Sequence, residues 1–186
     1  VPKHYYEALC DKMLSNGFFA RMLVFEAGPR GQGQEAVIRP LPEDVVRIAR
    51  WWAAYQPGGP GNLGAQHPTP AIVPLAADAQ DAAAEVRAAG DAAYAQAQAS
   101  DDTIGMAVWA RAAEKARKLA LLYAISADHE HPRITAEAIR WGWNVARHLT
   151  QRMLFMAGSH VFDSDFDALC KRMTTILQGW ADRHGD

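Results

Sequence analysis

Residues 103–127, TIGMAVWARAAEKARKLALLYAISA, are the most informative stretch for the fold class of this chain. Apolar side chains recur there every three or four residues, which is the spacing of one face of an α-helix. We therefore predict a single helix over 103–127, ended by His131-Pro132. Its dense apolar face consists of Met106, Trp109, Ala113, Ala116, Leu119, Ala120, Leu122 and Tyr123.

Helical patterns extend from this stretch in both directions. Pro42 is placed to be the first residue of a helix, and Glu43 and Asp44 follow where the helix dipole favours acids. Thr135 is a suitable N-cap for a helix that ends at Gly158. The predicted helices cover residues 4–16, 42–55, 77–99, 136–157 and, from a cap at Asp163 or Ser164, a last stretch to about 183.

Two short apolar runs, 22–25 and 72–75, are compatible with strands that pair as a small ribbon. Between them, residues 56–70 are rich in proline and glycine, a composition that excludes regular structure and marks the predicted boundary. The predicted class is mainly α, a helical bundle with a short β-ribbon or strand remnant near the N-terminus. We expect an N-terminal helix and strand remnant over 1–58 and a C-terminal bundle over 71–186.

The composition is that of a globular protein, and it narrows the classes of partner. The 186 residues carry a net charge of −2, so attraction to nucleic acid or to an anionic membrane must come from a local patch. Cys10 and Cys170 form no disulfide framework, and no apolar run reaches the roughly 20 residues that span a bilayer. We expect a soluble, cytoplasmic protein with no membrane partner, and the start without Met indicates a piece of a longer chain.

Several catalytic motifs are absent from the sequence. There is no GxxxxGK[ST] phosphate loop, no GxSxG, no HExxH and no paired-cysteine zinc signature, so the chain alone is not expected to run a nucleotide cycle. We interpret Gly28–Gly33 as an irregular loop and His129 with His131 as solvated turn residues. The acids Asp163, Asp165 and Asp167 suit the start of a helix better than a magnesium site.

Three cations have spacings that allow a role at a phosphate group. Arg111 and Lys118 flank Glu114 at three and four residues, so all three share a helix face. They form either a solvated set of ion pairs or cations directed at a nucleotide that a partner module holds. Arg21 lies inside the apolar run GFFARML, where a charge is costly unless it reaches a surface or a partner.

Four arginines form a local basic segment at 133–152. Arg133, Arg140 and Arg147 recur every seven residues, about two helical turns, and Arg152 follows closely. This stripe is either ordinary helix solvation or a surface that follows a nucleic-acid backbone. Trp141 and Trp143 flank it; we expect at least one to be buried, while an exposed Trp could stack a base.

Three stretches together resemble a known family: SNGFFARMLVFEAG (15–28), WARAAEKARKLALLYAISAD (109–128) and HPRITAEAIRWGWNVARHL (131–149). They are similar to the C-terminal helical region of phage and mobile-element proteins of the primase–helicase kind, whose parents have a RecA-like ATPase core. The resemblance covers about 15–175 and implies an arginine finger or sensor at Arg21, with Arg111 and Lys118 near the nucleotide. ATP and Mg²⁺ are implied for the parent only, because the phosphate loop is missing here.

These observations lead to a main hypothesis and two rivals. The first is an accessory domain of a DNA replication ATPase that packs on the rest of the parent and contacts single-stranded DNA. The second is a helical interaction or homo-oligomerisation module with no nucleotide role. A helical transcription regulator is the third. Arg21 separates the first two: burial in a salt bridge favours the module, whereas an exposed position beside 109–118 favours the ATPase.

Overall fold

The computed structural model describes residues 17–160 and 165–184. The predicted helix 4–16 and the predicted caps Asp163 and Ser164 lie outside this part of the chain. The chain divides into two compact units. One combines the residues up to Glu26 with those from Pro74 onward, and the other is Ala27–Val73. The predicted boundary segment, 56–70, falls inside the second unit.

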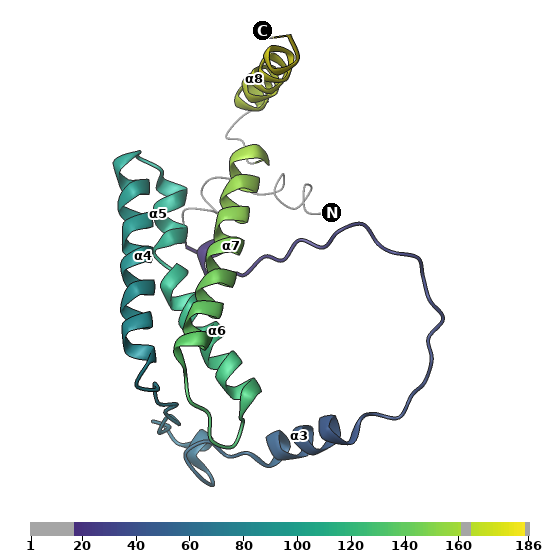
Figure 1. Cartoon of the computed structure of the whole chain (residues 1–186), viewed down its shortest axis with the longest axis vertical. Helices are drawn as coiled ribbons and strands as arrows, with labels where there is room; N and C mark the ends of the chain where they lie inside the picture. Colours follow the sequence, from purple (N-terminus) through teal and green to yellow (C-terminus); the bar gives the residue numbers. More distant parts are fainter. Residues whose placement is uncertain (1–16, 161–164, 185–186) are drawn as a thin grey trace. The chain divides into compact units, whose positions relative to one another are not determined.

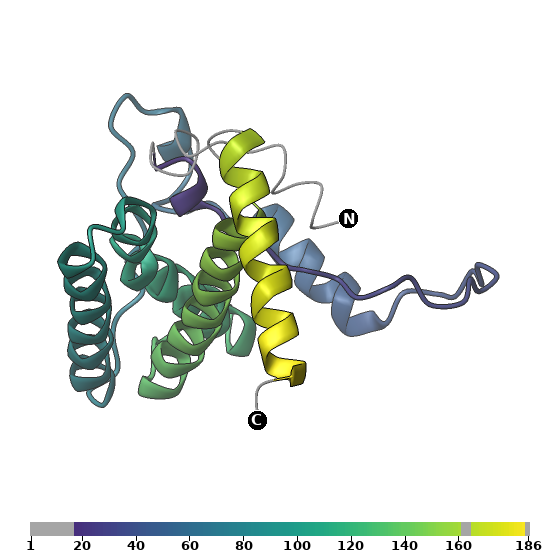
Figure 2. The same cartoon turned by 90° about the horizontal axis from the view of Figure 1, so that it is seen from above.

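The first unit contains a helical bundle, so the mainly α fold class is confirmed. Helices α6 (Ala112–Ala127) and α7 (Ala136–His160) form its principal contact. Helix α4 (Ala79–Ala99) packs on α7 and on the short helix α5 (Thr103–Trp109), as the two views in Figures 1 and 2 show. A further helix, α8 (Asp165–His184), follows α7 in the chain.

Small side chains allow these helices to approach each other closely. The core between α4, α6 and α7 is dominated by alanine, with Ala120, Ala138 and Ala146 completely buried. At Gly142 of α7, a methyl group in place of the hydrogen would collide with the Ala116 carbonyl oxygen of α6. Because a Cβ atom cannot approach backbone so closely, glycine at this position sets the distance between α6 and α7.

A second apolar cluster attaches the start of the described chain to the bundle. Phe19 and Ala20 belong to a 3-10 turn, η1 (Phe19–Arg21), and are 1% and 0% exposed. They pack with Val108 of α5 and with Met153 and Met156 of α7. Phe19 and Ala20 therefore anchor η1 to the bundle, whereas Arg21 of the same turn lies at the surface.

The prediction of one helix over 103–127 is wrong in one respect, because the helix is interrupted at Ala110 and Arg111. The Arg111 amide bonds to the Val108 carbonyl, three residues back, at 3.2 Å, and Arg111 becomes the N-cap of α6. Val108 and Ala112, on either side of the interruption, are both completely buried. Apolar periodicity did not reveal it, because each side of the break keeps helical spacing.

Helix α7 begins as predicted and ends later than predicted. The Ala138 amide donates to the Thr135 hydroxyl at 3.2 Å, which confirms Thr135 as a capping residue. The helix continues past Gly158 to His160. Among the described residues, no atom lies within 4 Å of the place that a Gly158 side chain would occupy, so they impose no packing requirement on this glycine.

The two predicted short strands do not pair with each other among the described residues. Residues 22–25 have no regular secondary structure. Leu75 instead makes a single parallel bridge with Ile134, supported by the Ala76 amide on the Ile134 carbonyl at 2.9 Å. The strand remnant near the N-terminus stays a prediction, and the bridge fastens the start of α4 to the start of α7.

The second unit, Ala27–Val73, is a loop-rich segment with one helix, α3 (Glu43–Ala54). Pro42 is its N-cap rather than its first residue. The segment 56–70, predicted to be irregular, contains a short 3-10 turn, η2 (Asn62–Gly64). Asn62 fixes this turn, because its side-chain amide donates to the carbonyls of Pro57 and Thr69, both at 2.8 Å.

Candidate functional site

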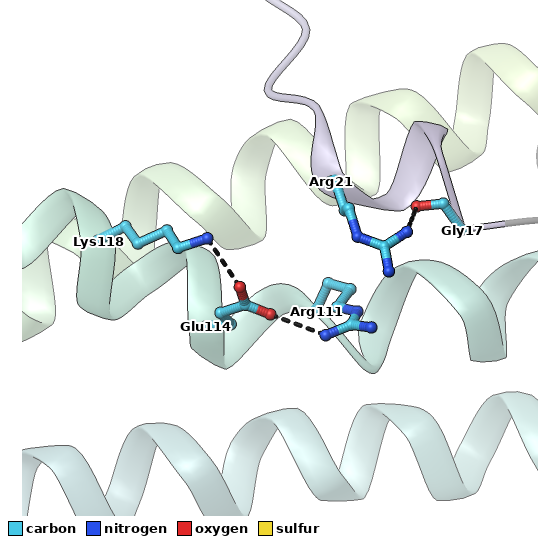
Figure 3. Close-up of polar contacts among 5 residues, drawn as sticks. All are labelled: Gly17, Arg21, Arg111, Glu114 and Lys118. Carbon is cyan, nitrogen blue, oxygen red and sulfur yellow. Dashed lines mark hydrogen bonds and ion pairs between the residues drawn. The ribbon is translucent and has the colours of Figure 1, made fainter. Parts of the chain in front are cut away.

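Arg21 lies on an exposed edge of the bundle, beside the first turns of α6. Its guanidinium Nη1 donates to the Gly17 carbonyl at 2.7 Å. Gly17 has a φ of +78°, a left-handed conformation that glycine adopts readily. Figure 3 shows the Arg21 side chain reaching from η1 toward the part of α6 that carries Arg111. Among the described residues, no carboxylate pairs with Arg21.

The charged face of α6 is formed as the spacing predicts. The Glu114 carboxylate bridges two cations: it accepts from Arg111 at 3.0 Å and from Lys118 at 2.7 Å (Figure 3). The hydrogen bond from Lys118, followed by that from Arg111, lowers the pKa of Glu114. The two cations are thus already arranged around one carboxylate-sized anion.

A small cavity brings Arg21 together with this face. Its volume is about 220 Å³, and its apolar wall is formed by Leu23, Leu119 and Leu122. Its charged lining is Arg21, Arg111, Glu114, Lys115 and Lys118. The three cations selected separately from the sequence, Arg21, Arg111 and Lys118, therefore line one cavity.

Lys115 is the residue of this cavity that the sequence reasoning passed over. It is 6% exposed, and burial lowers its pKa to about 8. No carboxylate pairs with it among the described residues. The signal was present in the helix pattern, because Lys115 lies between Ala112 and Leu119 on the buried face, where an aliphatic residue is expected.

The cavity carries a local positive charge on a chain whose net charge is −2. Four cations and one carboxylate line it, so its formal charge is +3 when Lys115 is protonated. It also lies against the first turns of α6, where the helix dipole favours anions. The arrangement is suited to holding an oxyanion such as a phosphate group.

The α7 arginines do not converge in the same way. Arg133 precedes α7, which leaves Arg140 and Arg147 as the pair in register, both exposed. Arg152 follows Arg147 by five residues, which is not a whole number of helical turns, so it lies on a different face of α7. Its Nε donates to the Glu26 carboxylate at 2.8 Å. Of the four arginines in the predicted stripe, Arg140 and Arg147 thus lie in helical register, Arg133 lies before the helix and Arg152 is paired with Glu26. Their contact with nucleic acid stays a prediction.

A larger hollow of about 720 Å³ lies next to the Arg152–Glu26 pair. Its lining is mainly apolar and includes Val24, Phe25, Val145 and Leu149, with Asn144 and His148 at the polar part. Since the ion pair neutralises its own two charges, this hollow offers an anion less than the smaller cavity does, despite its greater volume.

The two tryptophans of α7 have different environments. Trp143 is half-buried against the core between α4, α6 and α7. Trp141 is 42% exposed and its ring centroid lies 5.3 Å from that of Tyr123. The Tyr123 hydroxyl donates to Glu137 at 2.9 Å, and this bond raises the pKa of Tyr123. Trp141 is the tryptophan that a base could reach.

The weaker sequence patterns form no site in the described part of the chain. Gly28–Gly33 has no regular structure. The Asp128 carboxylate accepts from the amides of Glu130 and His131 at 3.0 and 2.9 Å, which shapes the turn after α6 and lowers the pKa of Asp128. Within residues 17–160 and 165–184, no group of three His, Cys, Asp or Glu side chains could hold a metal ion.

Comparison with protein-family models, with curated proteins and with solved structures finds no match to this chain. Within the described residues, no helix is long and apolar enough to cross a membrane.

Proposed function

We propose that this chain is an accessory helical domain of a phage or mobile-element DNA replication ATPase of the primase–helicase kind. In this role it has no catalysis of its own. It presents Arg21, Arg111 and Lys118 to the phosphates of a nucleotide that the ATPase core of the parent holds. Cations supplied in this way stabilise the charge that develops during phosphoryl transfer.

The observation that carries the proposal is the convergence of Arg21 on the cationic face of α6. Arg21 is about 90 residues from Arg111 in the sequence, yet both line one cavity. Arg21 is exposed and has no carboxylate partner among the described residues, which is the arrangement expected of an arginine that acts on another molecule. A salt bridge of Arg21 within the domain would instead have favoured the interaction module.

The size of the cavity favours a contact with part of a nucleotide. At about 220 Å³ it is smaller than the roughly 300–1,000 Å³ of pockets that enclose a whole small molecule. Phosphate groups can enter it, whereas the base and ribose remain outside. This division suits a nucleotide bound by a partner module and touched here only at its phosphates.

Contact with single-stranded DNA is the second part of the proposal, and Arg140, Arg147 and Trp141 support it. The two arginines lie in register on the exposed side of α7, as expected of residues that follow a phosphate backbone. Trp141 precedes Gly142 on the same helix and is partly exposed, so a base could stack on it.

The test is binding of ADP to the full chain at low ionic strength, measured by isothermal titration calorimetry. We expect binding that is strongly reduced in the Arg21→Ala/Arg111→Ala variant and unchanged in the matched Arg140→Ala/Arg147→Ala variant. Fluorescence anisotropy with a labelled oligothymidylate should give the opposite ranking of the two variants. Absence of ADP binding in the wild-type chain, even at high ADP concentration, would contradict a phosphate contact in this cavity.

A helical interaction or oligomerisation module is the alternative function, and α8 is the observation in its favour. Its exposed apolar residues Leu169, Met173, Ile176 and Trp180 are spaced by four, three and four residues, which is the heptad spacing of a helix seam. Sedimentation equilibrium of the wild-type chain and of Met173→Glu/Ile176→Glu tests this function. A wild-type oligomer that dissociates in the variant supports it, and a wild-type monomer argues against it.

A further inference from the structure

The cavity beside α6 contains one cation that differs from the others in its surroundings. Arg21, Arg111 and Lys118 are all at least partly accessible to solvent, whereas Lys115 is 6% exposed. A lysine at this depth loses hydration when it is charged. In the described residues it gains no carboxylate in exchange, so the cavity holds an amine whose charge is incompletely compensated.

We propose that Lys115 is the inner anchor of a binding site for a phosphate-sized oxyanion, and that occupancy of this site is linked to uptake of one proton by Lys115. The proposal rests on the proposed contact with phosphate groups and adds to it the residue that binds deepest and the response to pH. The proton comes from solvent, and the neutral amine becomes an ammonium that faces the bound anion.

The charges that surround Lys115 support this linkage. The charged groups that line the cavity with it are Arg21 from η1, Arg111 from the N-cap of α6, and Glu114 and Lys118 from α6. In the described part of the chain, α4, α5 and α7 contribute no charged side chain to the lining. Burial disfavours the positive charge on Lys115, while Glu114 is already engaged by Arg111 and Lys118. An added oxyanion supplies the missing negative charge.

The direction of the pH effect follows from the state of the empty site. Burial lowers the pKa of Lys115 to about 8, so above this pH the empty cavity holds mainly the neutral amine. An anion that binds the ammonium form must restore the proton, and this requirement weakens binding as the pH rises beyond about 8. Below this pH the lysine is already charged, and little proton uptake accompanies binding.

Inorganic sulfate is the probe for the experiment, because it has the tetrahedral shape of a phosphoryl group and no proton that titrates between pH 6 and 10. Calorimetry of the full chain in buffers with different ionisation enthalpies gives the number of protons taken up. Carbon-13 NMR of the lysine Cε resonances gives the pKa of Lys115 with and without sulfate. We expect uptake of a large part of one proton at pH 8.5, little at pH 6.5, and a higher pKa of Lys115 in the sulfate complex.

Two substitutions make the result specific to Lys115. Lys115→Arg keeps a permanent charge, so it should bind sulfate with equal affinity at pH 7 and 9 and without proton uptake. Lys115→Met should bind roughly tenfold more weakly at pH 7, a loss typical of one charged hydrogen bond. Lys118→Met removes an exposed cation of the same face, so it should weaken sulfate binding and still retain the proton uptake.

The outcomes separate this inference from the proposed function. Sulfate binding with an unchanged pKa of Lys115 would overturn the proton linkage and leave the phosphate contact intact. No sulfate binding at any pH would overturn both. Competition by ADP and by a short oligothymidylate then distinguishes a nucleotide's terminal phosphate from a DNA backbone phosphate as the natural source of the oxyanion.

Discussion

Two cationic regions of the helical bundle, the cavity beside α6 and the exposed side of α7, have similar charged residues and different geometry. In the α6 cavity, four cations from two separate segments and one carboxylate line the same volume. On α7, Arg140 and Arg147 stand in register at the surface, while Arg152 pairs with Glu26. The comparison shows that arginines close together in the sequence need not converge, whereas cations from two separate segments can line one cavity.

The difference has a simple electrostatic meaning. Charges at an open surface are screened by water and salt, so the α7 pair can contribute a salt-dependent contact along an extended polyanion. Charges around a partly enclosed cavity act at short range on a single group. We therefore expect the two regions to differ in ligand, in salt dependence and in sensitivity to pH.

The largest effect is expected from disrupting the packing of α6 against α7, the two helices that carry the two regions. Gly142→Leu places a side chain against the backbone of α6, where even a methyl group would collide with the Ala116 carbonyl oxygen. We expect it to destabilise the fold by about 3 kcal/mol or more, in the upper range for overpacking. Chemical denaturation followed by circular dichroism measures this.

Gly158→Ala is the matched control on the same helix, since no atom of the described residues lies within 4 Å of that side-chain position. It should leave stability unchanged or raise it by up to about 1 kcal/mol, because alanine favours the helix. Equal stability of the two variants would mean that α6 and α7 do not depend on close approach at Gly142.

The next prediction tests whether the α6 cavity and the α7 arginines bind different ligands. Arg21→Ala and Arg111→Ala should each reduce the affinity for sulfate roughly tenfold, the range for a lost charged hydrogen bond. The Arg140→Ala/Arg147→Ala variant should keep sulfate affinity and lower the salt dependence of oligothymidylate binding by about two phosphate contacts. Calorimetry and anisotropy over a salt series measure the two effects. If one variant impaired both ligands equally, the two regions would form a single surface.

A further effect concerns the free energy of unfolding, which the buried Lys115 lowers when no anion is bound. Its folded pKa, about 8, is below its unfolded value of 10.5, so the unfolded state binds more protons between these values and stability rises with pH across this window. Lys115→Met should therefore stabilise the fold below pH 8, by roughly 1–2 kcal/mol. The advantage should vanish by about pH 10.5. Thermal denaturation at several pH values checks this, and a Lys115→Met variant less stable than wild type at pH 7 would contradict it.

The smallest expected effect belongs to Glu114, the carboxylate already held by the α6 cations. Glu114→Gln removes the internal competitor for Arg111 and Lys118, and we expect sulfate affinity to rise roughly threefold, which corresponds to one weak ion pair. The melting temperature should change little at pH 7, since the pairs are exposed. A fall in sulfate affinity would instead assign Glu114 the task of positioning Arg111 and Lys118 for the ligand.

Local sequence patterns were sufficient for the helical class, the helix starts and the nearby charge pairs. Thr135 as a cap, α3 after Pro42 and the Arg111–Glu114–Lys118 pairs all depend on residues within one or two turns of each other. Such patterns can be seen in the sequence because backbone geometry fixes their spacing. The selection of Arg21 as a residue of interest also came from its local context, a charge within an apolar run.

Long-range packing was needed for the break at Ala110 and Arg111, the burial of Lys115 and the meeting of Arg21 with α6. Each depends on partners distant in the chain: Phe19 buried against α5 and α7 carries Arg21 to its position, and the close approach at Gly142 fixes α7 on α6. Apolar periodicity reports which face of a helix is buried but not where in the fold that face lies. A lysine on a buried face therefore becomes a candidate ligand-binding residue only when packing has placed other cations around it.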